Sequence, residues 1–162
     1  VDLILCESVA SVVHATAAAR GAQAAGKPVW LAFTVDDEDG SKLRSGEPLA
    51  DLGPALDGVE AVLANCSAPE AMMAAMTALK AFGLPFGAYA NGFQQITKEF
   101  LKENPTVDAL TARPEMTPEL YAGFVMDWIG MGATIVGGCC ETGPAHIAEC
   151  ARRIRVAGHT IV

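Results

Sequence analysis

The chain has 162 residues, of which 51% are hydrophobic and 19% are charged. Its 19 acidic residues exceed its 11 lysine and arginine residues and give a net charge of -8. Phosphate backbones and anionic membranes are repelled by such a chain, so we expect no nucleic acid and no membrane as partners. The sequence shows no secretory signal or transmembrane run, and its cysteines suit a reducing compartment, so we expect a cytoplasmic protein.

The first two predicted strand-helix units occupy the N-terminal part of the chain. Leu3–Leu5 is a short apolar run, and Ser8 is predicted to cap an alanine-rich helix over Ser8–Ala25. Val29–Val35 is the second strand. The acidic segment 36–40 is predicted to be a solvated turn, because an EF-hand loop placed here would end at a glycine where a glutamate is needed. Pro48–Leu56 is predicted to be a short helix.

Three further units follow. The predicted strands are Ala61–Ala64, Phe86–Tyr89 and Thr134–Val136. The predicted helices, each with proline in its first turn, are Pro69–Phe82, Pro118–Met131 and Pro144–Ala157. An extra helix over Thr97–Lys102 is predicted in the long connection before the fifth strand. Met72, Met73 and Met76 recur at helical spacing and are predicted to fill the core.

The repeated strand-helix unit decides the predicted fold class. Five units in a row predict parallel strands joined by right-handed crossovers, and the polar residues of chemical interest follow strand ends, as in a (β/α)8 TIM barrel. An open doubly wound sheet would carry a glycine-rich phosphate loop, and no G-x-G-x-x-G or Walker sequence is present. A full barrel needs about 250 residues and eight strands. We therefore expect residues 1–162 to be the C-terminal portion of a single α/β barrel domain, its last five strand-helix units.

Such a portion of a barrel would leave strand edges and an apolar face uncovered. A chain with a mean hydropathy of +0.30 is not expected to expose that surface as a stable monomer. Either an N-terminal segment of about three strand-helix units precedes Val1, or the chain covers its edges as a homo-oligomer, by self-association or by swapping elements. The start on an apolar strand without an initiator methionine favours the missing segment.

Three of the five cysteines follow predicted strands. Cys66 ends one apolar run, and Cys139 and Cys140 follow another after two glycines. Neighbouring side chains on a regular strand point to opposite faces, so the glycines would let the backbone leave the strand and direct both thiols to one ion. Three thiolates with an open fourth position are typical of a catalytic zinc site. The alternative is that the pair is structural, as we predict for Cys6 and Cys150, which are expected to be buried hydrophobes.

Other cysteine chemistry fits the sequence less well. A disulfide between adjacent cysteines would close a strained ring, and five cysteines would leave one thiol over. The absence of any C-x-x-C weakens both a zinc-ribbon and a thioredoxin-like interpretation.

Four short motifs carry a resemblance to a known family. They are Asn65-Cys66-Ser67, Tyr89-Ala90-Asn91-Gly92, Gly137-Gly138-Cys139-Cys140 and Pro144-Ala145-His146-Ile147. Together they resemble the zinc-dependent homocysteine S-methyltransferase family, from about the fourth barrel strand onward. The segments 140–143 and 35–46 are similar to the short bacterial members that use S-methylmethionine. Many members have glycine after the cysteine pair, where this chain has Glu141.

The resemblance implies a site and a reaction. Cys66, Cys139 and Cys140 would be the zinc ligands and catalytic residues. The reaction implied is methyl transfer from a sulfonium or ammonium donor (S-methylmethionine, S-adenosylmethionine or betaine) to the thiol of homocysteine, giving methionine. Homocysteine would take the open position on zinc, where a coordinating thiol exists as the thiolate and becomes a nucleophile without a general base.

Four other residues are predicted to bind substrate. By resemblance, Glu7, just beyond the first strand, would bind the ammonium group of homocysteine; alternatively it lies in the first turn of a helix. Asn65 would orient Cys66 or a zinc-bound group, although asparagine before a helix is also ordinary turn chemistry. Tyr89 and Asn91 would line the donor side, unless Tyr89 is a barrel-lining residue with a satisfied hydroxyl.

Two further interpretations belong to other functional classes. The chain could be a catalytically incomplete zinc-binding half-barrel, or a thiol redox protein. Zinc content separates the redox protein from the other two, and activity with bound zinc separates the enzyme from the half-barrel. His146 is predicted to be a surface or capping residue of the last helix.

Overall fold

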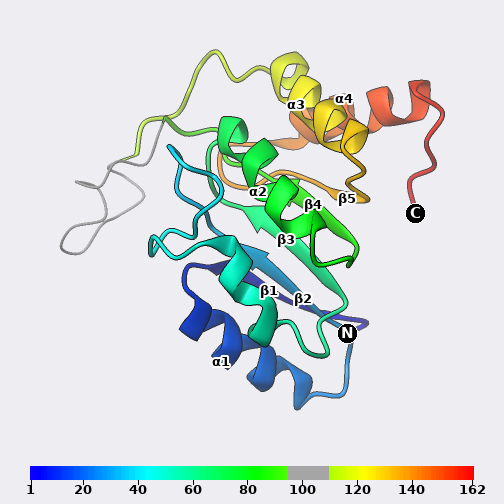
Figure 1. The fold of residues 1–162 in the computed structure, drawn as a ribbon. Helices are drawn as coiled ribbons and strands as arrows, with labels where there is room; N and C mark the ends of the chain where they lie inside the picture. Colours follow the sequence, from blue (N-terminus) through cyan, green and yellow to red (C-terminus); the bar gives the residue numbers. More distant parts are fainter. Residues whose placement is uncertain (95–109) are drawn as a thin grey trace.

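The computed structural model describes residues 1–94 and 110–162, and it contains a five-stranded parallel sheet (Figure 1). The strands are β1 (Ile4–Val9), β2 (Val29–Phe33), β3 (Ala61–Asn65), β4 (Phe86–Tyr89) and β5 (Ile135–Val136). They lie in the order β1-β2-β3-β4-β5, and each pairs in parallel with the next. An open doubly wound sheet reverses its strand order at a switch point. The sequential order is instead consistent with a portion of a TIM barrel.

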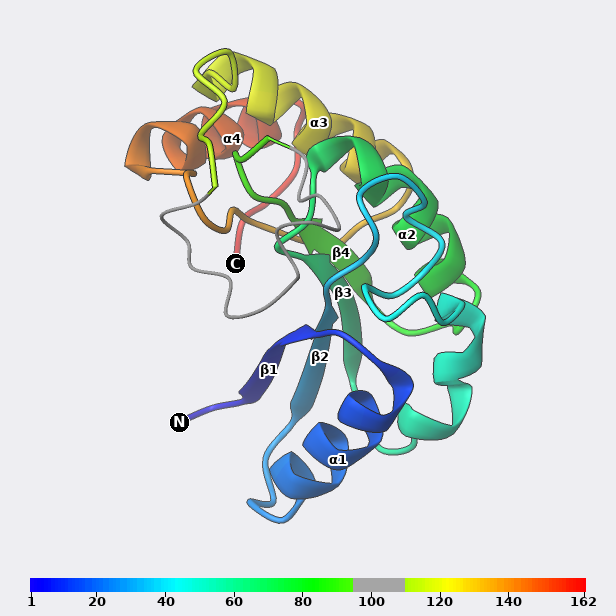
Figure 2. The same cartoon turned by 90° about the vertical axis from the view of Figure 1, so that its left-hand side faces the viewer.

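Helices cover one side of the curved sheet, as Figure 2 shows. The α-helices are α1 (Val12–Gln23), α2 (Met72–Lys80), α3 (Pro118–Gly130) and α4 (Pro144–Val156), and the 3-10 helices are η1 (Leu49–Ala55) and η2 (Pro69–Ala71). The short helix predicted at Pro48–Leu56 is therefore a 3-10 helix, and the helix predicted from Pro69 begins with one. The predicted helix Thr97–Lys102 lies outside the described residues.

Alternate residues along the strands build two apolar layers. Leu31 and Phe33 point to the helix side, where they join the main core with Trp128. Ala32 lies on the opposite side, in a small cluster with Leu63 and Tyr89. The sheet thus has one helix-covered face and one inner face, as each wall of a barrel does.

The methionine prediction is confirmed in part. Met72 and Met76 of α2 are fully buried in the main core, as their spacing predicts. Met73, which lies between them in sequence, is 41% exposed, because it points away from the sheet on the other side of the helix.

The predicted start of the chain is wrong in two respects. The first strand runs over Ile4–Val9 and not Leu3–Leu5, so Glu7 lies within the strand and not in a helical turn. The first helix begins at Val12, and its N-cap is Ser11, whose side chain accepts a hydrogen bond from His14 N at 3.1 Å. Pairing with β2 explains the difference, since extending the ladder as far as Val9 keeps Ser8 out of the helix.

β1 contains a bulge next to the predicted site. Between Cys6 and Val9 the register shifts, so that β1 has one more residue than the facing part of β2. Ser8, inside the bulge, has a left-handed φ of 55°. Bulges of this kind redirect a side chain at the end of a strand.

The acidic turn after β2 is solvated only in part. Asp36 accepts hydrogen bonds from Glu38 N and Asp39 N, and Asp39 pairs with Lys42 at 2.7 Å on the surface. Asp37 departs from the prediction, since its side chain is 2% exposed. Within residues 1–94 and 110–162, no helix has the length and apolar character needed to cross a bilayer.

The cap assignment gives a stability prediction. Ser11→Ala should lower the free energy of unfolding by about 1 kcal/mol, because the N–H of His14 loses its acceptor. Ser11→Asn, which keeps a capping oxygen, should leave stability nearly unchanged. Urea denaturation followed by circular dichroism measures both. Equal stability of Ser11→Ala and the parent chain would show that the helix is not capped here.

Candidate metal centre

The ends of β3, β4 and β5 stay joined by backbone hydrogen bonds beyond the sheet. These bonds run from Cys66 N to Tyr89 O (3.2 Å), from Cys139 N to Ala90 O (2.9 Å) and from Gly92 N to Cys140 O (2.9 Å). The carboxyl ends of neighbouring parallel strands lie at one edge of the sheet, so these bonds bring the three cysteines together although they are far apart in sequence.

The three thiols form a compact cluster. The Sγ atoms of Cys66, Cys139 and Cys140 all lie within 4.8 Å of one another. Cys66 and Cys139 are half-buried and Cys140 is exposed, so the cluster can be reached from solvent. Among the described residues, no other group of three or more histidine, cysteine, aspartate or glutamate side chains could hold a metal ion. Three thiolates suit zinc and leave a fourth position for another ligand.

The backbone around the cluster departs from ordinary strand geometry, but not where the sequence predicts. Neither Gly137 nor Gly138 has a positive φ, whereas Cys66 has a φ of 50° and Glu141 a φ of 62°. Glycine is needed at 138 for space, since a Cβ there would collide with the Thr142 hydroxyl. The strand ends at Val136, and the chain then turns so that both adjacent thiols face Cys66.

The pKa values of the three thiols shift in different directions. The pKa of Cys66 is lowered to about 6, chiefly because Cys139 hydrogen-bonds its sulfur. The same contact, together with burial, raises the pKa of Cys139, and burial raises the pKa of Cys140. Negative charge therefore collects first on Cys66, and the other two protons are retained until a cation balances the cluster.

Glu7 and Tyr89 lie together on the inner face of the sheet. The Tyr89 hydroxyl donates a hydrogen bond of 3.0 Å to Glu7 Oε1. Burial, and then this bond, raise the pKa of Tyr89, so the phenol stays protonated and keeps donating. The hydroxyl of Tyr89 is thus satisfied, as the barrel-lining alternative requires, but its partner is the predicted substrate-binding carboxylate.

Asn65 connects β3 to the bulge in β1. Its side chain is buried, its Oδ1 accepts from Ser8 N at 3.1 Å, and its Nδ2 donates to Ser8 Oγ at 3.1 Å. The Ser8 hydroxyl in turn hydrogen-bonds the Cys66 thiol and helps to lower its pKa, after the larger effects of Cys139 and Cys140. Asn65 therefore does more than form a turn, since it fixes a residue that touches the cysteine.

Asn91 follows the end of β4 and is bonded to the segment after Cys66. It is 1% exposed, its backbone N–H donates to Ser67 O at 3.1 Å, and its Oδ1 accepts from Phe93 N at 3.2 Å. Its Nδ2 is buried without a partner among the described residues. A buried amide donor of this kind is costly, so it marks a place where a ligand or water would be favoured.

Two structural residues of the centre were not predicted from sequence. The buried Tyr121 hydroxyl accepts from Ala90 N at 3.0 Å and donates to Gly137 O at 2.8 Å, which ties β4 to the cysteine loop. Ser67, at 0% exposed, accepts from Val35 N at 2.9 Å. Ser67 could have been found from the sequence, because it is a polar residue directly after a predicted metal ligand. Tyr121 could not, because its position in a predicted helix does not distinguish it from an aromatic residue of the core.

His146 is a capping residue, as predicted. Its Nδ1 accepts from Gly143 N at 3.1 Å, and its Nε2 is 2.8 Å from Met116 O. Because Nδ1 is the acceptor, Nε2 carries the proton and donates to the carbonyl. The ring therefore joins the start of α4 to the segment before α3.

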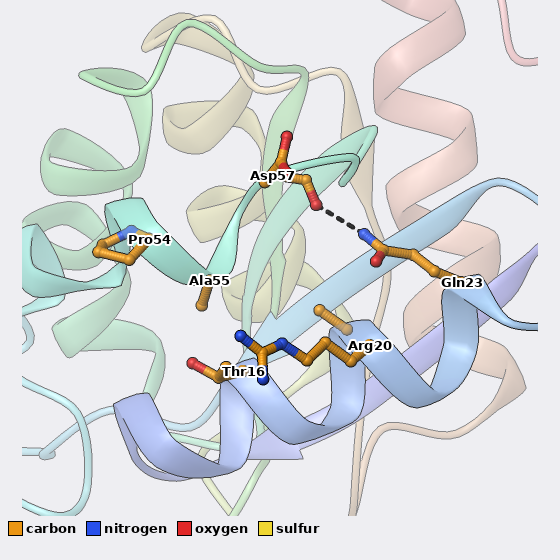
Figure 3. A pocket seen from close by; sticks show the side chains of 7 residues that line it. Thr16, Arg20, Gln23, Pro54, Ala55 and Asp57 are labelled. Atoms are coloured by element: carbon orange, nitrogen blue, oxygen red, sulfur yellow. Dashed lines mark hydrogen bonds between the residues drawn. The ribbon is translucent and has the colours of Figure 1, made fainter.

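A surface hollow between α1 and η1 is separate from the cysteine cluster (Figure 3). Seven residues line it, and they are Thr16, Ala19, Arg20, Gln23, Pro54, Ala55 and Asp57. Gln23 Nε2 donates to the carbonyl of Asp57 at 2.6 Å across it. None of the predicted site residues contributes to this hollow.

The family model of homocysteine S-methyltransferase matches residues 1–154. The chain belongs to this family. Homocysteine S-methyltransferase 4 of Zea mays is 29% identical over 96% of the chain and 45% of its own length. Homocysteine S-methyltransferase of Escherichia coli is 30% identical over 91% of the chain and 46% of its own length. The chain thus spans about half the length of these homocysteine S-methyltransferases.

Solved structures of the family agree with the fold. The metallated form of the homocysteine methyltransferase MmuM from Escherichia coli has a TM-score of 0.69 and 29% identity, over 94% of this chain and 45% of that chain. The apo form has the same TM-score and identity, over 94% of this chain and 50% of that chain. The parallel sheet described above is therefore a portion of the fold of homocysteine methyltransferases.

Glu141, where the resemblance would place glycine in many members of the homocysteine S-methyltransferase family, occupies a strained position. A left-handed φ costs a side-chain-bearing residue about 1–2 kcal/mol, against about 0.5–1 kcal/mol of entropy for glycine. Glu141→Gly should therefore raise the free energy of unfolding by about 0.5–1 kcal/mol, as measured by urea denaturation.

The matched control is Glu141→Ala, which removes the carboxylate but keeps the Cβ and hence the strain. It should not gain stability. If Ala and Gly stabilise equally, the effect comes from the carboxylate and not from the backbone.

Proposed function

We propose that the protein catalyses methyl transfer to homocysteine, with zinc held by Cys66, Cys139 and Cys140. The observation that carries the proposal is the cluster of three thiols within 4.8 Å at the carboxyl ends of parallel strands. Its accessible position and its sulfur-only donor set favour a site with an open fourth position. Family membership and a metallated structural neighbour support the same reading.

The reaction follows from the chemistry of the two substrates. The homocysteine sulfur forms a bond to the methyl carbon as the bond from that carbon to the donor sulfur or nitrogen breaks, and the electron pair leaves with the donor, which loses its positive charge. Bound zinc would lower the pKa of the homocysteine thiol, so that the thiolate is present near neutral pH. S-methylmethionine, S-adenosylmethionine and betaine all provide the required cationic methyl donor.

The chain's own residues would position the thiol and the donor. The Glu7 carboxylate accepts a hydrogen bond from the ammonium group of homocysteine, and the Tyr89 hydroxyl holds the Glu7 carboxylate in place. Asn65 fixes Ser8 against Cys66. Asn91 and the ring of Tyr89 line the donor side. Holding the homocysteine thiol and the donor methyl group in a reactive orientation removes part of the entropic barrier to methyl transfer.

The five strand-helix units are proposed to be the C-terminal portion of a barrel domain. The alternative function is a zinc-binding half-barrel that lacks activity by itself, and it is favoured by one observation, the coverage of 45% of the Zea mays relative. Turnover of homocysteine by the zinc-loaded chain supports the enzyme. Zinc binding without turnover supports the half-barrel.

Metal content tests the ligand assignment directly. Cys139→Ser should lose most of the zinc that the reduced parent chain retains after dialysis, because a neutral hydroxyl replaces a thiolate. Cys6→Ser, a control outside the cluster, should retain full zinc. Elemental analysis measures both, together with methionine formation from homocysteine and S-methylmethionine. Full zinc in Cys139→Ser would refute the assignment.

Substrate affinity tests Glu7. In the zinc-loaded chain, Glu7→Gln should weaken homocysteine binding by about 1.5–3 kcal/mol, because a charge-assisted hydrogen bond to the ammonium group is lost. Zinc content should not change. Glu60→Gln, remote from the inner face, is the control. Calorimetric titration that gave equal homocysteine affinities for all three chains would leave Glu7 without a binding role.

A further inference from the structure

The loop between β2 and η1 contains a buried ion pair. Arg44 Nη2 lies 3.2 Å from Asp37 Oδ1, and the two side chains are only 10% and 2% exposed. Burying a pair of charges requires the loss of their hydration, which offsets much of their attraction. An ion pair placed here therefore calls for a role other than stability.

The pair contacts the two residues that follow Cys66. The same nitrogen of Arg44 is 3.3 Å from Ser67 Oγ, and Asp37 Oδ1 accepts from Ala68 N at 2.9 Å. The guanidinium also reaches the hydroxyl of Thr34 at 3.5 Å. Ser67 is fully buried, so these contacts hold the short segment within the protein interior.

Thr34 extends the same network to Cys66 itself. Its hydroxyl lies 3.4 Å from the carbonyl oxygen of Cys66 and 3.2 Å from Ser67 Oγ. The carbonyl and the following two residues are thus all fixed from the β2 side, while the thiol of Cys66 remains directed to the cluster.

The backbone of Cys66 needs such support. Its φ of 50° is left-handed, a conformation that is strained for a residue with a Cβ. Strain of this kind persists only where the surroundings enforce it. If Cys66 relaxed to an ordinary φ, its Cβ and Sγ would turn away from Cys139 and Cys140.

We propose that Arg44 and Asp37 are positioning residues of the metal centre, which hold the segment after Cys66 so that its thiol meets the other two. The inference rests on the proposed function, since it takes the cysteine cluster to be a zinc site. Neither residue is one of the three thiol ligands. They act on the left-handed backbone of Cys66 through their contacts with Ser67 and Ala68.

The same loop supplies a matched control. Lys42 pairs with Asp39 at 2.7 Å, but these side chains are 48% and 45% exposed, and Lys42 makes no described contact with the segment after Cys66. Arg44→Met and Lys42→Met each remove one positive charge from this loop. Arg44 belongs to the network around Cys66, whereas Lys42 lies outside it.

The test is zinc affinity of the whole chain, measured by competition with a chromophoric chelator. Arg44→Met should bind zinc about 10- to 100-fold more weakly than the parent chain, the usual effect of removing a residue that supports a metal ligand. Lys42→Met should stay within about twofold of the parent. Cobalt(II) provides a second readout, since the sulfur-to-metal absorption should weaken in Arg44→Met, where one thiolate is misplaced.

A second variant covers the case in which Arg44→Met fails to fold. Thr34→Val keeps the ion pair and the shape of the side chain but removes the hydroxyl that reaches Cys66, and it should also weaken zinc binding several-fold. Circular dichroism shows which variants are folded. If Arg44→Met folds and its zinc affinity is within about twofold of that of the parent chain, the inference is overturned. If Arg44→Met does not fold, the same result for folded Thr34→Val overturns it. Failure of the parent chain itself to bind zinc would instead refute the proposed function.

Discussion

The candidate site depends on the hydrogen bonding that continues past the ends of three parallel strands. Cys66 N bonds to Tyr89 O and Cys139 N bonds to Ala90 O, so the loops that follow β3, β4 and β5 remain hydrogen-bonded to one another beyond the ends of the strands. Because of this continuation, thiols separated by more than 70 residues in sequence lie within 4.8 Å. The buried hydroxyl of Tyr121 joins two of these ends, since it bonds both Ala90 N and Gly137 O.

The electrostatics of the cluster follow from that crowding. The hydrogen bond between Cys66 and Cys139 lowers the pKa of Cys66 and raises that of Cys139, while burial and then the charge of Cys66 raise the pKa of Cys140. A divalent cation would resolve the conflict by holding all three as thiolates. The left-handed residues of the centre, Ser8, Cys66 and Glu141, surround the same cluster, as strained residues do at functional sites.

Much of this was predictable from the sequence, and the exceptions share a physical cause. Apolar runs and proline-led helices predicted the presence of all five strands, because these elements depend on local composition, although β1 extends further than predicted. The alternation of strands with helices predicted their parallel pairing. The motif around Cys139 and Cys140 predicted the cluster. The N-cap of α1 was predicted at Ser8 but lies at Ser11, because pairing of β1 with β2 overrides a local capping signal. The network around Arg44 was missed, because its partners meet only through the tertiary fold.

X-ray absorption at the zinc edge of the zinc-loaded chain tests the central claim most directly. Coordination by Cys66, Cys139 and Cys140 requires three sulfur scatterers at about 2.3 Å, with a lighter atom completing the shell. Added homocysteine should replace the lighter atom with a fourth sulfur at a similar distance. A shell with fewer than three sulfurs, or one that homocysteine leaves unchanged, would contradict the account.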